Sequence, residues 1–296
     1  MKIHKLAGID IGSNSVRLLV SNVIESGETI LFKKSSLTRL PIRLGPDAFG
    51  EGKISESNLK RLIAGMSAYR KIMEVHGVEK YRACATSALR ESKNGIQVVE
   101  RIYRESGVNI ELISGKEEAR MIFSSDMIGD VAEAHETFLY IDVGGGSTEL
   151  TLFHKGEIRN SRSFKIGTIR LLKDLVKKKR WEEMKEWIQE KTEDFDEVLM
   201  VGSGGNINRT FKLAQKRKGE TMTLKGLRGI REQILNFDDD QRMIEFDLNP
   251  DRTDVLPHAL RIYINAMKWA GAEEMIVPKK GLADGIVRFL FREHFQ

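Results

Sequence analysis

The stretch that decides the fold is Leu139-Tyr-Ile-Asp-Val-Gly-Gly-Gly-Ser-Thr-Glu-Leu-Thr-Leu152. Two apolar runs flank a turn that contains three glycines, with an aspartate before it and two hydroxyl residues and a glutamate after it. Two strands joined by a glycine turn predict a β-hairpin. A P-loop is not predicted, because its glycines must open a helix and be followed by Gly-Lys-Ser or Gly-Lys-Thr. The backbone amides of such a turn are suited to phosphate oxygens.

The same pattern occurs once earlier, in Leu6-Ala-Gly-Ile-Asp-Ile-Gly-Ser-Asn-Ser-Val-Arg-Leu-Leu-Val20. The aligned positions are Ile9 with Ile141, Asp10 with Asp142, Gly12 with Gly144, and Ser15 with Ser147. Each copy is followed by a predicted third strand, at 28–36 and at 157–164, and by a similar exit at 38–40 and 169–171. The sequence therefore predicts two related three-stranded units.

The length of 296 residues suits two domains, and 41% hydrophobic with 31% charged residues is typical of a globular protein with a full core. We expect one domain at 1–125, joined by a terminal helix at 281–296, and the other at 126–280. No apolar run approaches a membrane span, and the first residues lead into a strand rather than a signal peptide. A cytoplasmic protein without membrane contact is expected.

The cysteine and histidine content limits the kinds of catalytic and metal site that the chain can form. Cys84 is the only cysteine and lies in the apolar-leaning stretch Tyr81-Arg-Ala-Cys-Ala-Thr86, which favours a small buried residue over a nucleophile. The six histidines include no pair at i, i+4, so neither a zinc site nor the base of a catalytic triad is indicated.

The net charge of +5 favours an anionic partner. Basic residues concentrate in two runs, at 173–180 and at 212–218. Solvated helix faces explain each run, while contact with a long polyanion remains the alternative. No basic motif interleaved with aromatic residues is present, so nucleic acid is not expected as a partner.

A further glycine motif, Gly202-Ser-Gly-Gly-Asn206, follows a predicted strand at 198–201 and precedes a predicted helix at 207–214. Glycines that open a helix expose free backbone amides at its positive end, which favours an anion. A turn that needs glycine only for close packing is the alternative.

The stretch Ser114-Gly-Lys-Glu117-Glu118 predicts a capping box before an apolar helix face. Glu117 is placed to reach back to the cap, whereas Glu118 has no such structural task. A carboxylate without a structural task at a helix start is a candidate for chemistry. The alternative for Glu118 is a solvated surface glutamate.

Two facing units with glycine hairpins could hold one ligand in a cleft. The hydroxyls of Ser13, Ser15, Ser147 and Thr148 add hydrogen-bond donors to the amides. Asp10, Asp142 and Glu149 supply the hard oxygen ligands that suit magnesium shared with phosphate. The combination indicates phosphoryl chemistry, in which a glutamate can order the attacking water.

Six motifs together resemble the exopolyphosphatase and guanosine pentaphosphate phosphohydrolase (Ppx/GppA) family of the acetate kinase, actin and heat-shock-cognate superfamily. They are Gly8-Ile-Asp-Ile-Gly-Ser-Asn-Ser15, Ala85-Thr-Ser-Ala-Leu-Arg90, Ile113-Ser-Gly-Lys-Glu-Glu-Ala-Arg120, Ile141-Asp-Val-Gly-Gly-Gly-Ser-Thr-Glu149, Gly202-Ser-Gly-Gly-Asn206 and Arg252-Thr-Asp-Val-Leu256. The resemblance implies an α/β fold with two ribonuclease H-like (actin-like ATPase) domains. Each domain would carry a mixed five-stranded sheet flanked by helices, with the active site in the interdomain cleft.

The resemblance also implies roles for single residues. Glu118 would be the base that activates water. The residues that would hold phosphates are Ser13, Asn14, Ser15, Arg90, Gly144, Gly145, Gly146, Ser147, Thr148, Gly204, Gly205, Asn206 and Arg252. Asp142, Glu149 and Asp10 would bind Mg²⁺ or another hard divalent cation.

The implied reaction is hydrolysis of the terminal phosphate from inorganic polyphosphate or guanosine pentaphosphate, and the sequence does not choose between these substrates. The chain is similar to the short two-domain form of the family, and a homodimer is a further expectation. Two alternatives in the same superfamily are an ATP-dependent small-molecule kinase and an actin-like nucleotide switch. No motif for a phosphoacceptor pocket and no partner-binding domain supports them.

Overall fold

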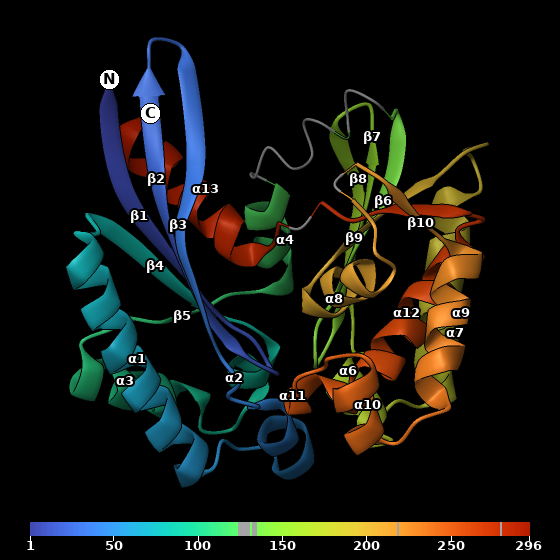
Figure 1. The fold of residues 1–296 in the computed structure, drawn as a ribbon, viewed down its shortest axis with the longest axis horizontal. Helices are drawn as coiled ribbons and strands as arrows, with labels where there is room; N and C mark the ends of the chain where they lie inside the picture. The colour runs from blue at the N-terminus through green and yellow to red at the C-terminus, as the bar shows by residue number, and fades with distance from the viewer. Residues whose placement is uncertain (124–130, 132–134, 218, 279) are drawn as a thin grey trace. The chain divides into compact units, whose positions relative to one another are not determined.

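The computed structural model describes residues 1–123, 131, 135–217, 219–278 and 280–296. The chain divides into two compact units (Figure 1). Unit 1 comprises Met1–Ser125 and Gly281–Gln296, and unit 2 comprises Asp126–Lys280. The last segment of the chain thus returns to the unit that the first segment builds.

Unit 1 contains a mixed five-stranded sheet in the order β3-β2-β1-β4-β5. Its strands are β1 (Lys2–Ile11), β2 (Val16–Ser26), β3 (Thr29–Leu40), β4 (Lys80–Ala85) and β5 (Glu111–Leu112). The first three strands are antiparallel neighbours, whereas β4 runs parallel to β1 and β5 parallel to β4. This arrangement confirms the mixed five-stranded sheet that the family resemblance implies, although β5 has only two residues.

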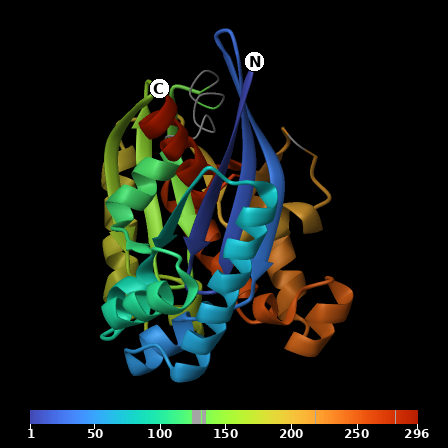
Figure 2. The same cartoon turned by 90° about the vertical axis from the view of Figure 1, so that its left-hand side faces the viewer.

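Helices cover both faces of this sheet. They are η1 (Asp47–Glu51), α1 (Glu56–His76), α2 (Ser87–Glu91), α3 (Gly95–Ser106), α4 (Gly115–Phe123) and α13 (Leu282–Phe295). Local signals mark the ends of two of these helices: the Ser55 side chain accepts a hydrogen bond from the Asn58 amide at the start of α1, and Gly107 ends α3 with φ of 72°. Figure 2 shows α1 lying against the strands.

Alternation along β1 divides the core of unit 1 into two layers. Ala7 and Ile9 join the apolar cluster under α1 and α3. Gly8 lies on the opposite face, where a Cβ atom would stand 2.6 Å from the Ala283 carbonyl oxygen of α13. Successive side chains of a strand point to opposite faces, so the single strand organises both layers.

Unit 2 contains a mixed six-stranded sheet in the order β10-β11-β9-β6-β7-β8. Its strands are β6 (Thr137–Val143), β7 (Thr148–His154), β8 (Glu157–Phe164), β9 (Leu199–Ser203), β10 (Thr221–Thr223) and β11 (Glu274–Ile276). The sixth strand is β10, which the sequence prediction omitted. It has three residues at the edge of the sheet, too few for a recognisable alternation.

The helices of unit 2 are α6 (Thr168–Leu172), α7 (Lys178–Thr192), α8 (Gly205–Leu213), α9 (Leu224–Leu235), α10 (Asp239–Glu245), α11 (Pro250–Thr253) and α12 (Leu256–Trp269). The sequence predicts one helical region at 171–191 and a polar, loop-like stretch at 237–256, and both predictions need correction. The first region is divided into two helices, because Asp174 between them takes a left-handed φ of 53°. The second contains α10, which Asp238 and Gln241 cap and which buries none of its residues.

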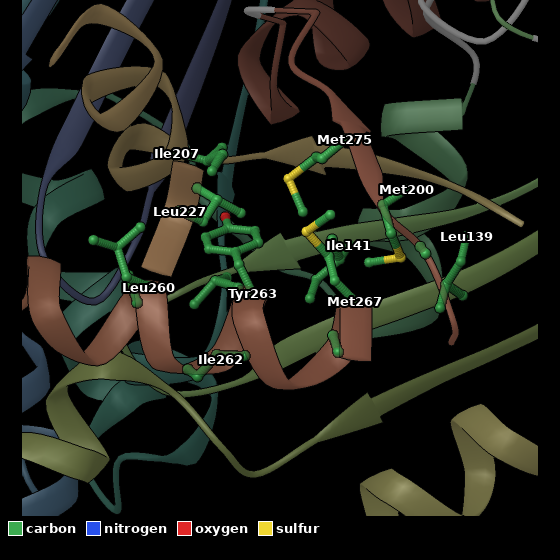
Figure 3. Packing of buried hydrophobic residues seen from close by; sticks show 14 of the residues in the cluster. Leu139, Ile141, Met200, Ile207, Leu227, Leu260, Ile262, Tyr263, Met267 and Met275 are labelled. Atoms are coloured by element: carbon green, nitrogen blue, oxygen red, sulfur yellow. The ribbon is translucent and has the colours of Figure 1, made fainter. Parts of the chain in front are cut away.

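The core of unit 2 forms between the sheet and α12 (Figure 3). Tyr263 and Met267 of α12 point toward Ile141 of β6, Met200 of β9 and Met275 of β11, and all five side chains are buried. The strand that leads into the glycine turn, β6, therefore packs against α12 and pairs with β9 and β7. None of the helices in the described ranges is long and apolar enough to cross a membrane.

The contact between α13 and α4 depends on Gly285. A Cβ atom there would lie 2.1 Å from the Met121 carbonyl oxygen, a backbone atom that cannot turn aside. We expect Gly285→Ala to lower the free energy of unfolding by about 1–3 kcal/mol, as overpacked interiors do. Chemical denaturation measures this change.

The matched control is Gly229→Ala in α9, where nothing lies within 4 Å of the added atom. Because alanine favours the helix, this change should raise the free energy of unfolding by up to about 1 kcal/mol. An equal rise in both variants would contradict the close contact.

Candidate functional site

The two glycine turns close with the same hydrogen bond. In unit 1 the Gly12 amide donates to the Ser15 carbonyl at 3.1 Å, and in unit 2 the Gly144 amide donates to the Ser147 carbonyl at 2.9 Å. Both turns join antiparallel strands in register. The two predicted hairpins and their internal repetition are therefore confirmed.

The start of α6 holds the glycine turn of unit 2 from one side. The Thr168 amide donates to the Gly144 carbonyl at 3.0 Å, and the Ile169 amide donates to the Gly145 carbonyl at 2.9 Å. The Arg170 side chain completes the set, since its Nε donates to the Gly146 carbonyl at 2.7 Å. Three consecutive carbonyl groups of the turn are thus bound by one helix start.

This arrangement orients the amides of the turn. In a trans peptide the C=O and N–H bonds point in opposite directions. Because the carbonyls of Gly144, Gly145 and Gly146 face α6, the amides of Gly145, Gly146 and Ser147 are directed away from it. Consecutive amides that point to one side form the kind of concave anion site that phosphate occupies.

Two residues that support the turn were not predicted as part of a site. One is Arg170, described above; the other is Gly167, where a Cβ atom would lie 2.4 Å from the Gly145 carbonyl oxygen. The internal repeat did contain a signal for Arg170, because the segment 169–171 that carries it aligns with 38–40 of the first copy. Gly167 had no signal, since its need for glycine arises from a contact 22 residues away in sequence.

The hydroxyls of unit 2 have partners within the protein. Thr148 is fully buried and its Oγ1 donates to the Ile166 carbonyl at 2.7 Å. The Ser147 hydroxyl donates to Glu149 Oε1 at 2.6 Å, and Ser163 donates to the same oxygen at 3.0 Å. These contacts hold the turn and the Glu149 carboxylate in place, and the phosphate-binding role of Ser147 and Thr148 stays a prediction.

In unit 1 a hydroxyl within the glycine turn contacts a second motif. Ser13 is buried and its Oγ lies 3.0 Å from the Oγ of Ser87, at the start of α2. The same helix carries Arg90, whose Nη1 donates to the Ile113 carbonyl at 2.6 Å. The structure thereby places three of the predicted motifs of unit 1 side by side.

Asp142 and Glu149 face each other across the hairpin of unit 2. They are directly paired in the register of β6 and β7, so both side chains project from the same face of the sheet. Glu149 is buried and, as described, accepts two hydroxyl donors. Two carboxylates at this spacing form a set of hard oxygen donors.

The start of α8 lies beside one of these carboxylates. Gly204 has φ of 107°, and a Cβ atom on it would stand 2.9 Å from Asp142 Oδ1. The helix begins at Gly205, as the glycine motif predicted, and its positive end favours the negative charge. The close approach that was one interpretation of this motif is therefore present, and the binding of an anion at the helix start stays a prediction.

Tyr263 and Arg252 complete the surroundings of this carboxylate. The Tyr263 hydroxyl donates to the Ser203 carbonyl, and burial, followed by the nearby Asp142 charge, raises the pKa of the phenol. The Arg252 guanidinium donates to the Gly205 carbonyl. The loosely matching Arg252 motif therefore lies at the start of α8, together with Gly204, Gly205 and Asn206.

Asp10 has a different partner from its counterpart Asp142. It pairs in register with Arg17, whose Nη1 lies 3.6 Å from the Asp10 carboxylate. Burial raises the pKa of Asp10, and Arg17 opposes this shift. Among the described residues, no cluster of three or more His, Cys, Asp or Glu side chains is suited to a metal ion. The pair in unit 2 is thus the carboxylate arrangement that could bind a cation together with water and phosphate.

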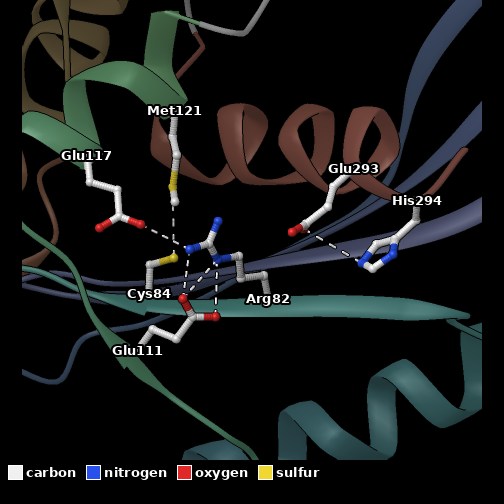
Figure 4. A network of polar contacts seen from close by, with 7 residues as sticks. All are labelled: Arg82, Cys84, Glu111, Glu117, Met121, Glu293 and His294. Carbon is white, nitrogen blue, oxygen red and sulfur yellow. Dashed lines mark hydrogen bonds and ion pairs between the residues drawn. The ribbon is translucent and has the colours of Figure 1, made fainter. Parts of the chain in front are cut away.

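Glu117 and Glu118 lie in the first turn of α4, as predicted. The Ser114 hydroxyl accepts a hydrogen bond from the Glu117 amide at 3.1 Å, which confirms the cap. The expected return of the Glu117 side chain to the cap is wrong, because its carboxylate pairs with Arg82 at 3.0 Å (Figure 4). Glu118 also makes a polar interaction, contrary to the expectation that it has no partner.

Arg82 connects α4 to the sheet. Its guanidinium lies 2.7 Å from Glu111 of β5 as well as 3.0 Å from Glu117, and it packs over the Phe289 ring of α13 at 4.8 Å (Figure 4). Arg82 itself projects from β4. One side chain therefore fixes the start of the helix that carries Glu118.

Cys84 lies next to this network and is buried, as predicted. Its sulfur lies 4.0 Å from the Met121 sulfur, and burial raises the pKa of the thiol to about 12. A thiol with this pKa carries almost no thiolate near neutral pH. Cys84 is therefore a structural residue.

The chain was compared with known protein families and relatives. The family model described as the Ppx/GppA phosphatase family matches residues 20–294. A bifunctional 3-dehydroquinate synthase/phosphatase of Fusobacterium nucleatum is 29% identical over 293 residues, covering 92% of this chain and 44% of the relative. Exopolyphosphatase 1 of Mycobacterium tuberculosis is 28% identical over 241 residues, covering 78% of this chain and 69% of the relative.

A guanosine-5'-triphosphate,3'-diphosphate pyrophosphatase of Aliivibrio fischeri is 25% identical over 295 residues, covering 95% of this chain and 58% of the relative. The chain thus spans less than half of the Fusobacterium relative and somewhat more than half of the Aliivibrio relative.

Solved structures show the same fold. The Ppx/GppA enzyme of Aquifex aeolicus matches with a TM-score of 0.75 at 23% identity, covering 97% of this chain and 100% of that one. An exopolyphosphatase from Cytophaga hutchinsonii matches with a TM-score of 0.82 at 21% identity, covering 98% of both chains. The fold is the actin-like two-domain fold of these enzymes, as the sequence predicted.

The contact of Gly167 with the glycine turn can be tested by Gly167→Ala. The added methyl group would meet backbone atoms of Gly145 and Gly146 at about 2.5 Å, so the turn must move. We expect the amide signals of 145–147 to shift in NMR spectra and the free energy of unfolding to fall by about 1–3 kcal/mol.

Gly281→Ala provides the control, because Gly281 has extended backbone with φ of −157° and open space around the added atom. It should leave both measurements nearly unchanged. Unshifted signals at 145–147 in Gly167→Ala would show that the turn does not depend on this contact.

Proposed function

The chain belongs to the Ppx/GppA phosphatase family, and we propose that it hydrolyses the terminal phosphate of a linear phosphoanhydride, inorganic polyphosphate or guanosine pentaphosphate. The names of the Mycobacterium and Aliivibrio relatives support this class of substrate. The observation that carries the proposal is the turn at 144–147, whose three outward amides lie next to the carboxylates of Asp142 and Glu149.

The amides of the turn would bind the oxygens of the terminal phosphate. Because α6 and Arg170 hold the carbonyls behind them, these amides need no reorganisation when negative charge develops. Arg252, at the start of α8, and Arg90, at the end of α2, would offset the charge of the phosphate chain.

Asp142 and Glu149 would hold Mg²⁺, and their hard oxygen donors fit this ion. When bound, the ion supplies charge neutralisation and polarises the phosphate oxygens. The protein contributes the orientation of both carboxylates: two hydroxyls fix Glu149, and the start of α8 lies against Asp142. Asp10 fits this role less well, since Arg17 already neutralises it.

Glu118 would act as the general base. In the proposed step its carboxylate takes a proton from water as the water oxygen bonds to the terminal phosphorus. The bridging P–O bond then breaks, and the shortened chain leaves with the electron pair and the negative charge. This division of labour, in which the protein positions groups and offsets charge, is typical of phosphoryl transfer.

Replacing Glu118 by Gln removes the base and keeps the shape of the side chain. We expect phosphate release to fall by a factor of about 10²–10⁴, with substrate binding retained. The assay compares polyphosphate, guanosine pentaphosphate and ATP, each with magnesium and with a chelator. Release from ATP alone would favour the kinase or nucleotide-switch alternatives.

Glu117→Gln is the matched control, since it makes the same chemical change one residue earlier. The Glu117 carboxylate pairs with Arg82 and has no proposed role in the reaction, so removing its charge should lower turnover much less than Glu118→Gln does. Turnover near the wild-type rate in Glu118→Gln would refute the assigned base.

Arg82 is proposed as a positioning residue for Glu118. Arg82→Met removes the contacts with Glu111 and Glu117, so the start of α4 loses its tie to the sheet. We expect kcat to fall on the order of tenfold, because misplacement of a reacting group slows the chemical step. KM should stay nearly constant, because Arg82 does not touch the proposed phosphate site.

Arg82→Lys keeps the charge but lacks the planar fork that reaches two carboxylates, so an intermediate kcat is expected. Steady-state kinetics of the three proteins make the comparison. If KM rises while kcat is unchanged, Arg82 acts on binding and the positioning role is wrong.

A further inference from the structure

Unit 2 contains a pocket that none of the proposed catalytic or phosphate-binding residues lines. Its volume is about 260 Å³, and it lies between the start of α9, the end of α12 and the segment before β11. The lining residues are Leu224, Lys225, Arg228, Met267, Lys268, Gly271, Ala272 and Glu273. Buried apolar side chains form its floor, and charged side chains form its rim.

The rim carries an excess of positive charge. Lys225, Arg228 and Lys268 face one carboxylate, that of Glu273, and within the described part of the chain none of the three cations makes an ion pair. An uncompensated group of like charges is unfavourable until an anion binds. The pocket is therefore suited to an anionic ligand.

The basic run at 173–180 behaves differently. In α7, Lys178 pairs with Glu182 at 3.5 Å and Arg180 pairs with Glu183 at 2.8 Å. Part of the positive charge that the sequence indicated there is thus compensated on the same helix. Lys218, at the end of the second run, lies outside the described residues. On the pocket rim, by contrast, none of the three cations of α9 and α12 is paired within the described part of the chain.

The helix start adds to the attraction. Thr223 caps α9 with its side chain, and the first turn contains no acidic residue. The first turn of a helix normally favours acidic side chains, whereas here it carries Lys225. An anion in the pocket would meet both the positive end of the helix and the basic rim.

The positive charge continues beyond the pocket along the same two helices. Arg231 of α9 donates to the Pro257 carbonyl at the start of α12, and Arg261 lies over the Trp181 ring at 4.9 Å. Burial, and then the nearby Arg261 charge, lower the pKa of Arg231. Glu232 opposes this effect in part. Figure 1 shows α9, α12 and α7 together in unit 2.

The spacing of these cations indicates an elongated ligand. Six residues of helix separate Lys225 from Arg231, a rise of about 9 Å. A single phosphate is too small to span this distance, whereas a chain of phosphates can. The lining contains no aromatic ring on which a base could stack, which argues against single-stranded nucleic acid.

We propose that this pocket is a second site for linear oligophosphate, separate from the glycine turn. Lys225, Arg228 and Lys268 bind the chain oxygens, and Arg231 and Arg261 extend the contact for longer chains. The site goes beyond the proposed function, because it binds the chain without cleaving it. Its test therefore does not require hydrolysis.

The experiment uses Met267, whose side chain lines the pocket, as a local probe. The protein is labelled with ¹³C at its methionine methyl groups, Met267→Leu assigns the signal, and tripolyphosphate is titrated in the presence of a chelator. We expect a saturable shift of the Met267 signal. Met73, buried in α1 of unit 1, serves as a reference that should not move.

The variant K225Q/R228Q/K268Q should weaken this binding about tenfold or more, since each exposed ion pair contributes up to a few-fold. All three residues are exposed, so the fold should be kept. The control K178Q/K179Q/K185Q removes the same charge from exposed positions of α7 and should bind like the wild type.

Three results would overturn the proposal. They are a Met267 signal that does not move, equal weakening in both triple variants, and a shift caused by ATP but not by tripolyphosphate, which would indicate recognition of the nucleoside. Shifts with both ligands support recognition of the phosphate chain. Failure of phosphate release in the catalytic assay would leave this titration unaffected, so the two proposals can fail separately.

Discussion

The contact between the start of α6 and the carbonyls of the turn at 144–147 is the constraint on which the site of unit 2 depends. Three carbonyl groups are bound from one side, so three amides must face the other. The same contact explains Gly167, whose missing side chain allows the close approach. Thr148 adds a second constraint, since its hydroxyl donates to the Ile166 carbonyl and holds the end of the turn. Backbone geometry rather than side-chain chemistry therefore makes this turn suitable for phosphate.

The two copies of the hairpin share this backbone but differ in charge. In the first copy, Arg17 stands opposite Asp10, whereas in the second Glu149 stands opposite Asp142. In the first copy the arginine lies 3.6 Å from the aspartate and offsets its charge, whereas the second copy offers two carboxylates as hard oxygen donors. The residue at the paired position therefore sets the charge of each hairpin. The internal repeat predicts the backbone geometry that the two hairpins share. The register of each strand pair predicts which residue faces the aspartate and thus the difference in charge.

Much of the fold could be predicted because its signals are local. Alternating apolar residues, glycine turns, the Ser55 cap and the Gly107 end all depend on residues a few positions apart. The secondary-structure predictions failed where an element depends on tertiary contacts or where its sequence signal is too short. The α10 helix buries no residue and so has no apolar period, and β10 has three residues. Arg170 and Gly167 belong to the site only because α6 packs against the glycine turn. This contact joins segments that are distant in the sequence, so no local pattern predicts it.

The placement of Glu118 shows how local and distant constraints combine. The Ser114 cap fixes where α4 begins and hence the sequence position of both glutamates. The direction of the helix, however, depends on Arg82 from β4 at one end and on Gly285 from α13 at the other. The last helix of the chain therefore contributes to the position of a residue about 170 positions earlier. Glu117 pairs with Arg82, so the two adjacent glutamates have different surroundings although they follow one another in the sequence.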